Sequence, residues 1–303
     1  MNNTKVCCFL MLLVGFISFS GLSGLQAQNY KVDDSFSGQA LTNVIYLAAM
    51  SDNTVCGLKS DGTVILVKAN GTVAKEFKAP LANGKVVAVD DKDIIYVLGG
   101  DQNVDPDANP RAPRPIKCVA MDKNGKILKE MAMPDLSNPS GMKIHGGKLY
   151  VADPAKRGIN ILDAQTGELI KNVDKLRSCC GILDFDITAK NEIVLAHLGA
   201  FKVEYLDMEG TSQRGFGERG SDVSQFHGCC NPVGVGYLSS GDIVTVEKDP
   251  TRVKVYNAKQ EVAVIDGIAE LVKGCAYVPI IVDGKDNIYL SSPRQGMIRC
   301  IPQ

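Results

Sequence analysis

The chain contains no tryptophan, only three histidines and no excess of charge of either sign. Its 33 basic and 34 acidic residues give a formal net charge of −1, so nothing in the composition points to a nucleic acid or an anionic membrane as partner. Helix-like spacing of apolar residues is also rare. What the chain has instead is short apolar runs punctuated by 30 glycines and 13 prolines, which favours an all-β protein.

The first residues have the layout of a targeting segment. Lys5 precedes an apolar stretch, Val6–Phe19, and a region of small residues follows that ends in "LQAQ". This order is typical of a secretory signal peptide cut after Ala27, and the stretch is short for a membrane span of about 20 residues. We therefore expect residues 1–27 to be a signal peptide and residues 28–303 to be the folded domain. The mature chain would be periplasmic or secreted, with no integral membrane segment.

The rest of the chain repeats one pattern six times. Each copy has an apolar run, a polar turn, a second run ending in a polar residue, a third run and, except in the last copy, a fourth. The copies span residues 45–77, 86–131, 141–170, 182–212, 232–262 and 278–303. A single four-stranded sheet can bury both of its faces only if it lies between two other sheets. Arranging the six copies radially around an axis gives every sheet two such neighbours. The repeat predicts a six-bladed β-propeller with four-stranded blades, closed by residues 29–36 as the missing outer strand.

Two copies resemble NHL-repeat six-bladed propellers. They are "DIVTVEKDPTRVKVYNAKQE" (242–261) and "KLYVADPAKRGINILDAQTGE" (148–168). NHL propellers serve as interaction platforms, and related six-bladed propellers include lactonases and a zinc-dependent lyase. The resemblance therefore implies the fold and little about function.

Cysteines recur in the segment that leads into a first strand, here called the lead-in loop. The sequence "RSCCG" carries Cys179 and Cys180, "HGCCNP" carries Cys229 and Cys230, and "KGCAY" carries Cys275. These loops belong to three successive blades and should open on one face of the ring. We expect the five sulfurs to gather at one side of the channel mouth, with His227 as a neighbour.

Four interpretations of such a cluster are open. Disulfides between blades are the expected state of an exported chain, although their pairing cannot be read from the sequence. Thiolates with an imidazole would suit zinc or copper. An iron–sulfur cluster is the third alternative, because "CCG" resembles a twin-cysteine iron–sulfur motif, and redox-active thiols are the fourth. A disulfide between two loops, here called a staple, needs only one cysteine in each loop. The two adjacent cysteine pairs therefore favour a role for the cysteines beyond cross-linking.

Polar residues that end second strands, or lie in the loops after them, are expected on the same face. They are Asp153, Arg157, His197, Glu247 and Arg252. Glu247 and the two arginines would form ion pairs between blades. The sequence has no serine-nucleophile elbow, no phosphate-binding glycine loop and no HExxH motif.

Together these features predict an exported binding or assembly module with a cysteine-lined site at the channel mouth, where a protein partner or a small ligand would bind. One alternative is a redox or electron-transfer protein whose cysteines hold zinc, copper or an iron–sulfur cluster. The other is a lactonase- or lyase-type enzyme that uses Asp153, His197 and Glu247 as metal ligands or acid–base groups. Whether the chain is an enzyme is left open.

Overall fold

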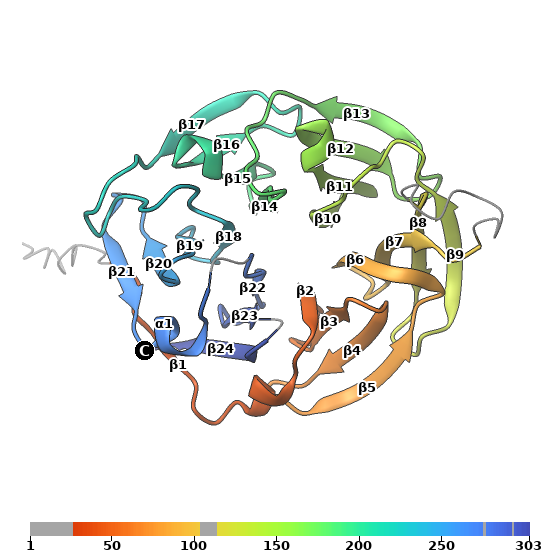
Figure 1. Cartoon of the computed structure of the whole chain (residues 1–303), viewed down its shortest axis with the longest axis horizontal. Coiled ribbons are helices and arrows are strands. Elements are labelled where there is room, and N and C mark those ends of the chain that lie inside the picture. The colour runs from red at the N-terminus through yellow and green to blue at the C-terminus, as the bar shows by residue number, and fades with distance from the viewer. Residues whose placement is uncertain (1–26, 104–113, 275–276, 293) are drawn as a thin grey trace, which may run out of the picture.

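Six antiparallel sheets of four strands each form a closed ring around a central axis (Figure 1). The computed structural model describes residues 27–103, 114–274, 277–292 and 294–303. The expected signal peptide therefore lies almost entirely outside the described residues. Within the described part, no helix is long and apolar enough to cross a membrane. The predicted six-bladed β-propeller is confirmed.

The first three blades follow the chain from the inner strand outward. Blade 1 contains β2 (Val44–Ala49), β3 (Val55–Lys59), β4 (Thr63–Val67) and β5 (Val73–Lys78). Blade 2 contains β6 (Leu81–Val89), β7 (Ile95–Asp101), β8 (Ile116–Met121) and β9 (Ile127–Ala132). Blade 3 contains β10 (Gly141–His145), β11 (Lys148–Asp153), β12 (Gly158–Asp163) and β13 (Leu169–Val173).

The next two blades repeat this order, and the last takes one strand from the other end of the chain. Blade 4 contains β14 (Asp184–Ile187), β15 (Ile193–His197), β16 (Lys202–Leu206) and β17 (Ser212–Phe216). Blade 5 contains β18 (Gly234–Tyr237), β19 (Ile243–Glu247), β20 (Arg252–Tyr256) and β21 (Val262–Ile265). Blade 6 contains β22 (Ile280–Val282), β23 (Ile288–Ser292), β24 (Gly296–Pro302) and β1 (Tyr30–Val32). The short helices are η1 (Ser37–Ala40), η2 (Pro154–Lys156), η3 (Leu198–Ala200) and α1 (Ile268–Leu271).

The core lies between neighbouring sheets, because the middle strands bury both faces. Every residue of the second strands β15, β19 and β23 is buried, whereas the outer strand β9 has one buried residue of six. Turn chemistry allows the blades to pack closely. Asp207 accepts the backbone N–H groups of Glu209 (3.0 Å) and Thr211 (2.8 Å), and Gly210 between them has a φ of 85°. A Cβ at Gly210 would overlap Val173 of the preceding blade, so only glycine fits.

The outer edge of blade 6 is covered by β1, which pairs antiparallel with β24. The segment that follows β1 is anchored as well. Phe36 is 1% exposed and lies edge-on to the ring of Tyr289, with 5.8 Å between the ring centroids. Asp33 forms an ion pair with Arg299 of β24. The two ends of the described chain therefore belong to one sheet.

Candidate functional site

A cavity on the axis of the ring receives residues from all six blades. Its volume is about 430 Å³, a size typical of small-molecule sites. The residues that line it are Ile45, Tyr46, Lys85, Ser140, Cys180, Gly181, Ile182, Lys248 and Tyr277. They lie on inner strands, in lead-in loops or, for Lys248, in the loop that follows β19. The cavity is therefore the point where the six blades converge.

Two lysines make part of the cavity wall positive. Lys248 is 3% exposed, and within the described part of the chain its ammonium forms no ion pair. Its position is fixed through the backbone, since its N–H donates to the Asn231 side-chain oxygen at 2.9 Å. Lys85 donates to the Asn138 side-chain oxygen at 3.4 Å. An ammonium on so buried a residue has little water around it and no carboxylate, so an anion bound here would be stabilised.

A buried carboxylate lies beneath the cavity. Asp184 on β14 is 3% exposed and accepts the backbone N–H of Val235 and the hydroxyl of Tyr277, both at 3.0 Å. Burial raises the pKa of Asp184 to about 6, although the Lys143 ammonium and the two hydrogen bonds oppose the shift. Burial also raises the pKa of Tyr277 well above its usual value, so this phenol stays protonated.

Further along the channel, Asp186 pairs with Lys143 at 3.0 Å and accepts the backbone N–H of Tyr237 at 3.3 Å. Burial alone would lower the pKa of Lys143, but the carboxylates of Asp186 and Asp184 outweigh it and raise the pKa. Lys143 and Asp186 line a second cavity of about 190 Å³. The channel thus holds a polar network that links the inner strands of blades 3, 4 and 5.

The pKa of Asp184 predicts how stability depends on pH. In the unfolded chain this carboxyl has its ordinary pKa of 3.8, against a pKa of about 6 in the folded state. Between these values the folded protein holds a proton that the unfolded chain has lost, so this group's contribution falls as pH rises from about 4 to 7. Because Asn does not titrate, we expect the free energy of unfolding of the wild type to fall by about 3 kcal/mol relative to that of Asp184→Asn over that interval. Urea unfolding at several pH values measures it, and a constant difference would contradict the assignment.

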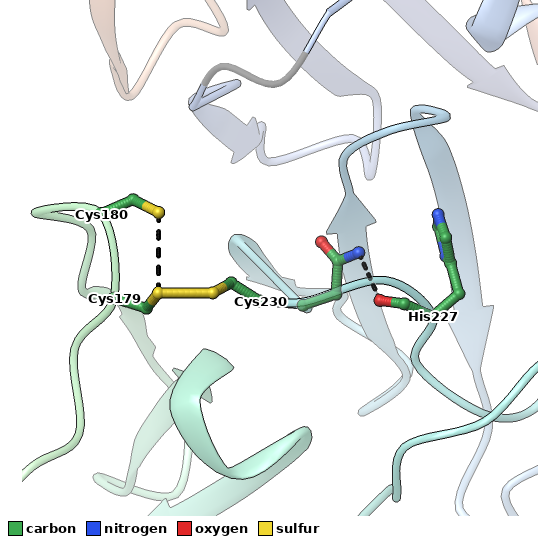
Figure 2. Close-up of a disulfide and its surroundings, with 5 residues drawn as sticks. Cys179, Cys180, His227 and Cys230 are labelled. Atoms are coloured by element: carbon green, nitrogen blue, oxygen red, sulfur yellow. Dashed lines mark hydrogen bonds between the residues drawn. A yellow bond between two sulfur atoms is a disulfide. The ribbon is translucent and has the colours of Figure 1, made fainter.

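A disulfide between Cys179 and Cys230 joins the lead-in loops of blades 4 and 5 (Figure 2). Its Cα atoms are 6.5 Å apart, and the residues are separated by 51 positions in sequence. Cross-links of this kind typically stabilise a fold by about 2–4 kcal/mol. The thiol of Cys180 lies beside it, 3.6 Å from the sulfur of Cys179, and the three sulfurs are within 4.8 Å of one another. A staple between blades is therefore present, with a third sulfur next to it.

Among the described residues, the cluster holds fewer cysteines than the sequence suggested. Cys229 is exposed and does not belong to the group, while its neighbour Cys230 is 6% exposed and faces inward. His227 is turned away from the sulfurs (Figure 2), and its Nε2 donates to the carbonyl of Asp249 at 3.0 Å. Cys275 lies outside the described residues. Neighbouring side chains on the "HGCC" segment point in different directions, so only one of its cysteines reaches the group.

Three further cysteines belong to the core. Cys56, Cys118 and Cys300 lie on strands and are fully buried. Burial raises the pKa of each thiol to about 12, so these cysteines stay protonated and unreactive.

The polar residues that end second strands hold lead-in loops and do not line the axial cavity. Asp153, fully buried, accepts the backbone N–H groups of Ser137 (2.6 Å), Asn138 (3.2 Å) and Ala155 (3.1 Å). Its carboxylate thereby fixes the loop that leads into blade 3. Asp153 thus bonds the lead-in loop and does not line the cavity, because the backbone of the loop has N–H groups that need an acceptor.

His197 has the same role in blade 4. Its Nε2 accepts the backbone N–H of Arg177 at 3.0 Å, so its proton is on Nδ1, which donates to Glu204 at 2.6 Å. Burial raises the pKa of Glu204, but hydrogen bonds from Ser212, His197 and Lys202 outweigh it and lower the pKa to about 2. Both histidine nitrogens are occupied, so a metal would have to displace one of these bonds.

Glu247 is the corresponding residue in blade 5 and is fully buried. It pairs with Arg252 at 2.6 Å, forms an ion pair with Lys254 and contacts His227 Nδ1. The Glu247–Arg252 pair lies within one blade, not between blades as expected, because β19 and β20 are adjacent strands of the same sheet. Arg157 is exposed and ends η2 in a left-handed conformation.

Sequence reasoning missed the residues that line the channel. Asp184 and Asp186 stand two apart in the run "LDFDI", and this alternation places both on one face of an inner strand. That signal could have been found. Lys248 and Tyr277 gave no such signal, because each adjoins a feature that drew more attention, Glu247 in one case and Cys275 in the other.

Comparison with known proteins supports the fold. No family model and no curated protein sequence matches the chain. A protein of unknown function from Bacteroides thetaiotaomicron VPI-5482 superposes with a TM-score of 0.62 and 12% identity, covering 90% of this chain and 76% of that one. A streptogramin B lyase gives a TM-score of 0.60 at 10% identity, covering 91% of this chain and 98% of that one. A virginiamycin B lyase from Staphylococcus aureus gives a TM-score of 0.58 at 10% identity, covering 90% of this chain and 99% of that one. Such low identities show the fold alone, and the NHL assignment stays a prediction.

Proposed function

We propose that the protein is an exported binding module that holds a small organic anion in the axial cavity. Lys248 carries the proposal, because the residue is nearly buried, lines a cavity to which all six blades contribute, and has no carboxylate partner in the described part of the chain. Lys85 adds a second positive charge. The side chains of Tyr46 and Tyr277 supply aromatic wall for the organic part of the ligand.

Benzoate and benzamide form a matched pair of probes, because they share shape and ring and differ in charge. Hydrogen bonds to charged groups are worth about 1.5–3 kcal/mol. We therefore expect benzoate to bind at least about tenfold more tightly than benzamide in titration calorimetry. Lys248→Met should remove most of this preference. Lys156→Met, which changes an exposed lysine on η2 outside the cavity, should leave it intact. Equal affinity of the wild type for the two probes would rule the proposal out.

A second candidate is acid–base catalysis in the same cavity. The observation that favours it is Asp184, whose pKa of about 6 is near neutrality and which is hydrogen-bonded to the cavity-lining Tyr277. Two of the structures with a similar fold are described as lyases, which supports the fold as a host for such chemistry and no more. The lyase ligands suggested by the sequence, Asp153, His197 and Glu247, are engaged with the lead-in loops and with neighbouring side chains instead.

A further inference from the structure

The position of Cys180 is not explained by the staple, which needs only Cys179 and Cys230. Residues 179–182 form a tight turn in which the N–H of Ile182 donates to the carbonyl of Cys179 at 3.0 Å. Cys180 and Gly181 both have positive φ, 56° and 69°. This is the pattern of a type I′ turn, in which Asn, Asp or Gly normally takes the first central position.

A residue other than glycine in the left-handed region costs about 1–3 kcal/mol. Asparagine would suit this turn better than cysteine does. What the cysteine gains is the place of its thiol, which lies 3.6 Å from the sulfur of Cys179 (Figure 2). Cys180 also lines the axial cavity. The local conformation therefore points to a use for the third sulfur.

The spacing of the sulfurs suits a thiolate metal site. Three thiolates that share one ion at about 2.3 Å stand roughly 3.8–4.0 Å apart. The sulfurs of Cys179, Cys180 and Cys230 already lie within 4.8 Å of one another. Breaking the bond between Cys179 and Cys230 would let that pair move apart to the required separation. Lys85 and Lys248 line the same cavity as Cys180 and would offset the negative charge of a three-thiolate complex.

We infer that Cys179, Cys180 and Cys230 form a redox-gated site for one soft cation, Cu⁺. A dithiol reductant donates two electrons and two protons to the Cys179–Cys230 disulfide and becomes a cyclic disulfide. The cation then displaces the protons of the three thiols, which are released to solvent. Soft thiolate sets select Cu⁺, and no fourth protein ligand joins this group among the described residues. The oxidised form has one thiol left and is closed to the cation.

The test uses the full-length folded domain, reduced with a dithiol or left oxidised, and titrated with Cu⁺ without oxygen against a colorimetric chelator. We expect the reduced protein to take one equivalent and the oxidised protein none. Cys180→Asn should bind about 100-fold more weakly or worse, since a ligand is lost and mutation of an outer-shell partner alone costs about 10–100-fold. Its fold should be retained or more stable, because asparagine suits the turn, so the loss cannot be misfolding. Cys229→Ser is the matched control and should bind as the wild type does.

Three results would overturn the inference. They are equal binding by the oxidised and reduced proteins, unchanged binding by Cys180→Asn, and a loss of binding in Cys229→Ser as large as in Cys180→Asn. None of these results bears on benzoate binding to the oxidised protein. The cation site and the anion site are therefore tested by independent experiments.

Discussion

A chain that begins at Ser37 should be at least about 5 kcal/mol less stable than one that begins at Gln28, and should aggregate. The deletion removes β1 and Phe36, which is 1% exposed, and loss of a buried phenylalanine alone costs about 3–5 kcal/mol. It also leaves the hydrogen-bonding edge of β24 open to another chain. Denaturant unfolding and light scattering measure the two effects.

Point variants in the chain of unchanged length distinguish the effect of losing the ring closure from the effect of shortening the chain. Phe36→Ala should reproduce much of the loss, while Lys31→Ala, an exposed position on β1, should change stability by less than about 0.5 kcal/mol. If the shortened chain melts as the longer one does, β1 does not close the ring in solution.

Glu247→Ala should be the most destabilising single substitution among the polar residues, by about 3–5 kcal/mol. It leaves Lys254, whose side chain is 0% exposed, without its carboxylate, and breaking one partner of a buried pair has this cost. Burial already lowers the pKa of Lys254, which shows how poorly the site solvates an ammonium. Chemical denaturation gives the free energy of unfolding directly.

The matched controls are the exposed Glu209→Ala, which should be nearly neutral, and the double variant Glu247→Met with Lys254→Met. Removing both buried charges should recover a large part of the loss, since well-packed apolar residues often replace such pairs without penalty. A loss below about 1 kcal/mol for Glu247→Ala would mean that the charge cluster is solvated and not structural.

The ring could be predicted from sequence because the signal is local and repeated. In each copy the polar turns mark where the apolar strands begin and end, and six such copies restrict the arrangement to a propeller. The cysteine-bearing lead-in loops were placed on one face for the same reason. Which cysteines pair could not be predicted, since that depends on the direction of each side chain. Cys230 faces inward while Cys229, one residue earlier, is exposed.

The role of the polar residues at the ends of second strands could not be predicted, for a physical reason. The ends of second strands look like site positions because they combine charge with a loop, as at Asp153 and His197. In the folded protein these side chains satisfy backbone N–H groups of the neighbouring loop, a need that is invisible in sequence. Lys248 adjoins such a position, yet it lines the cavity. The difference is set by the geometry of the loop after β19.

The most direct measurement is a crystal structure of the oxidised protein with benzoate. The anion should lie in the axial cavity with its carboxylate within hydrogen-bonding distance, about 2.7–3.2 Å, of the Lys248 ammonium. Its ring should pack against the wall that Tyr46 and Tyr277 form together, since the centroids of these two rings are only 6.4 Å apart. Benzoate bound elsewhere on the protein while the axial cavity holds only water would contradict an anion site at the convergence of the six blades.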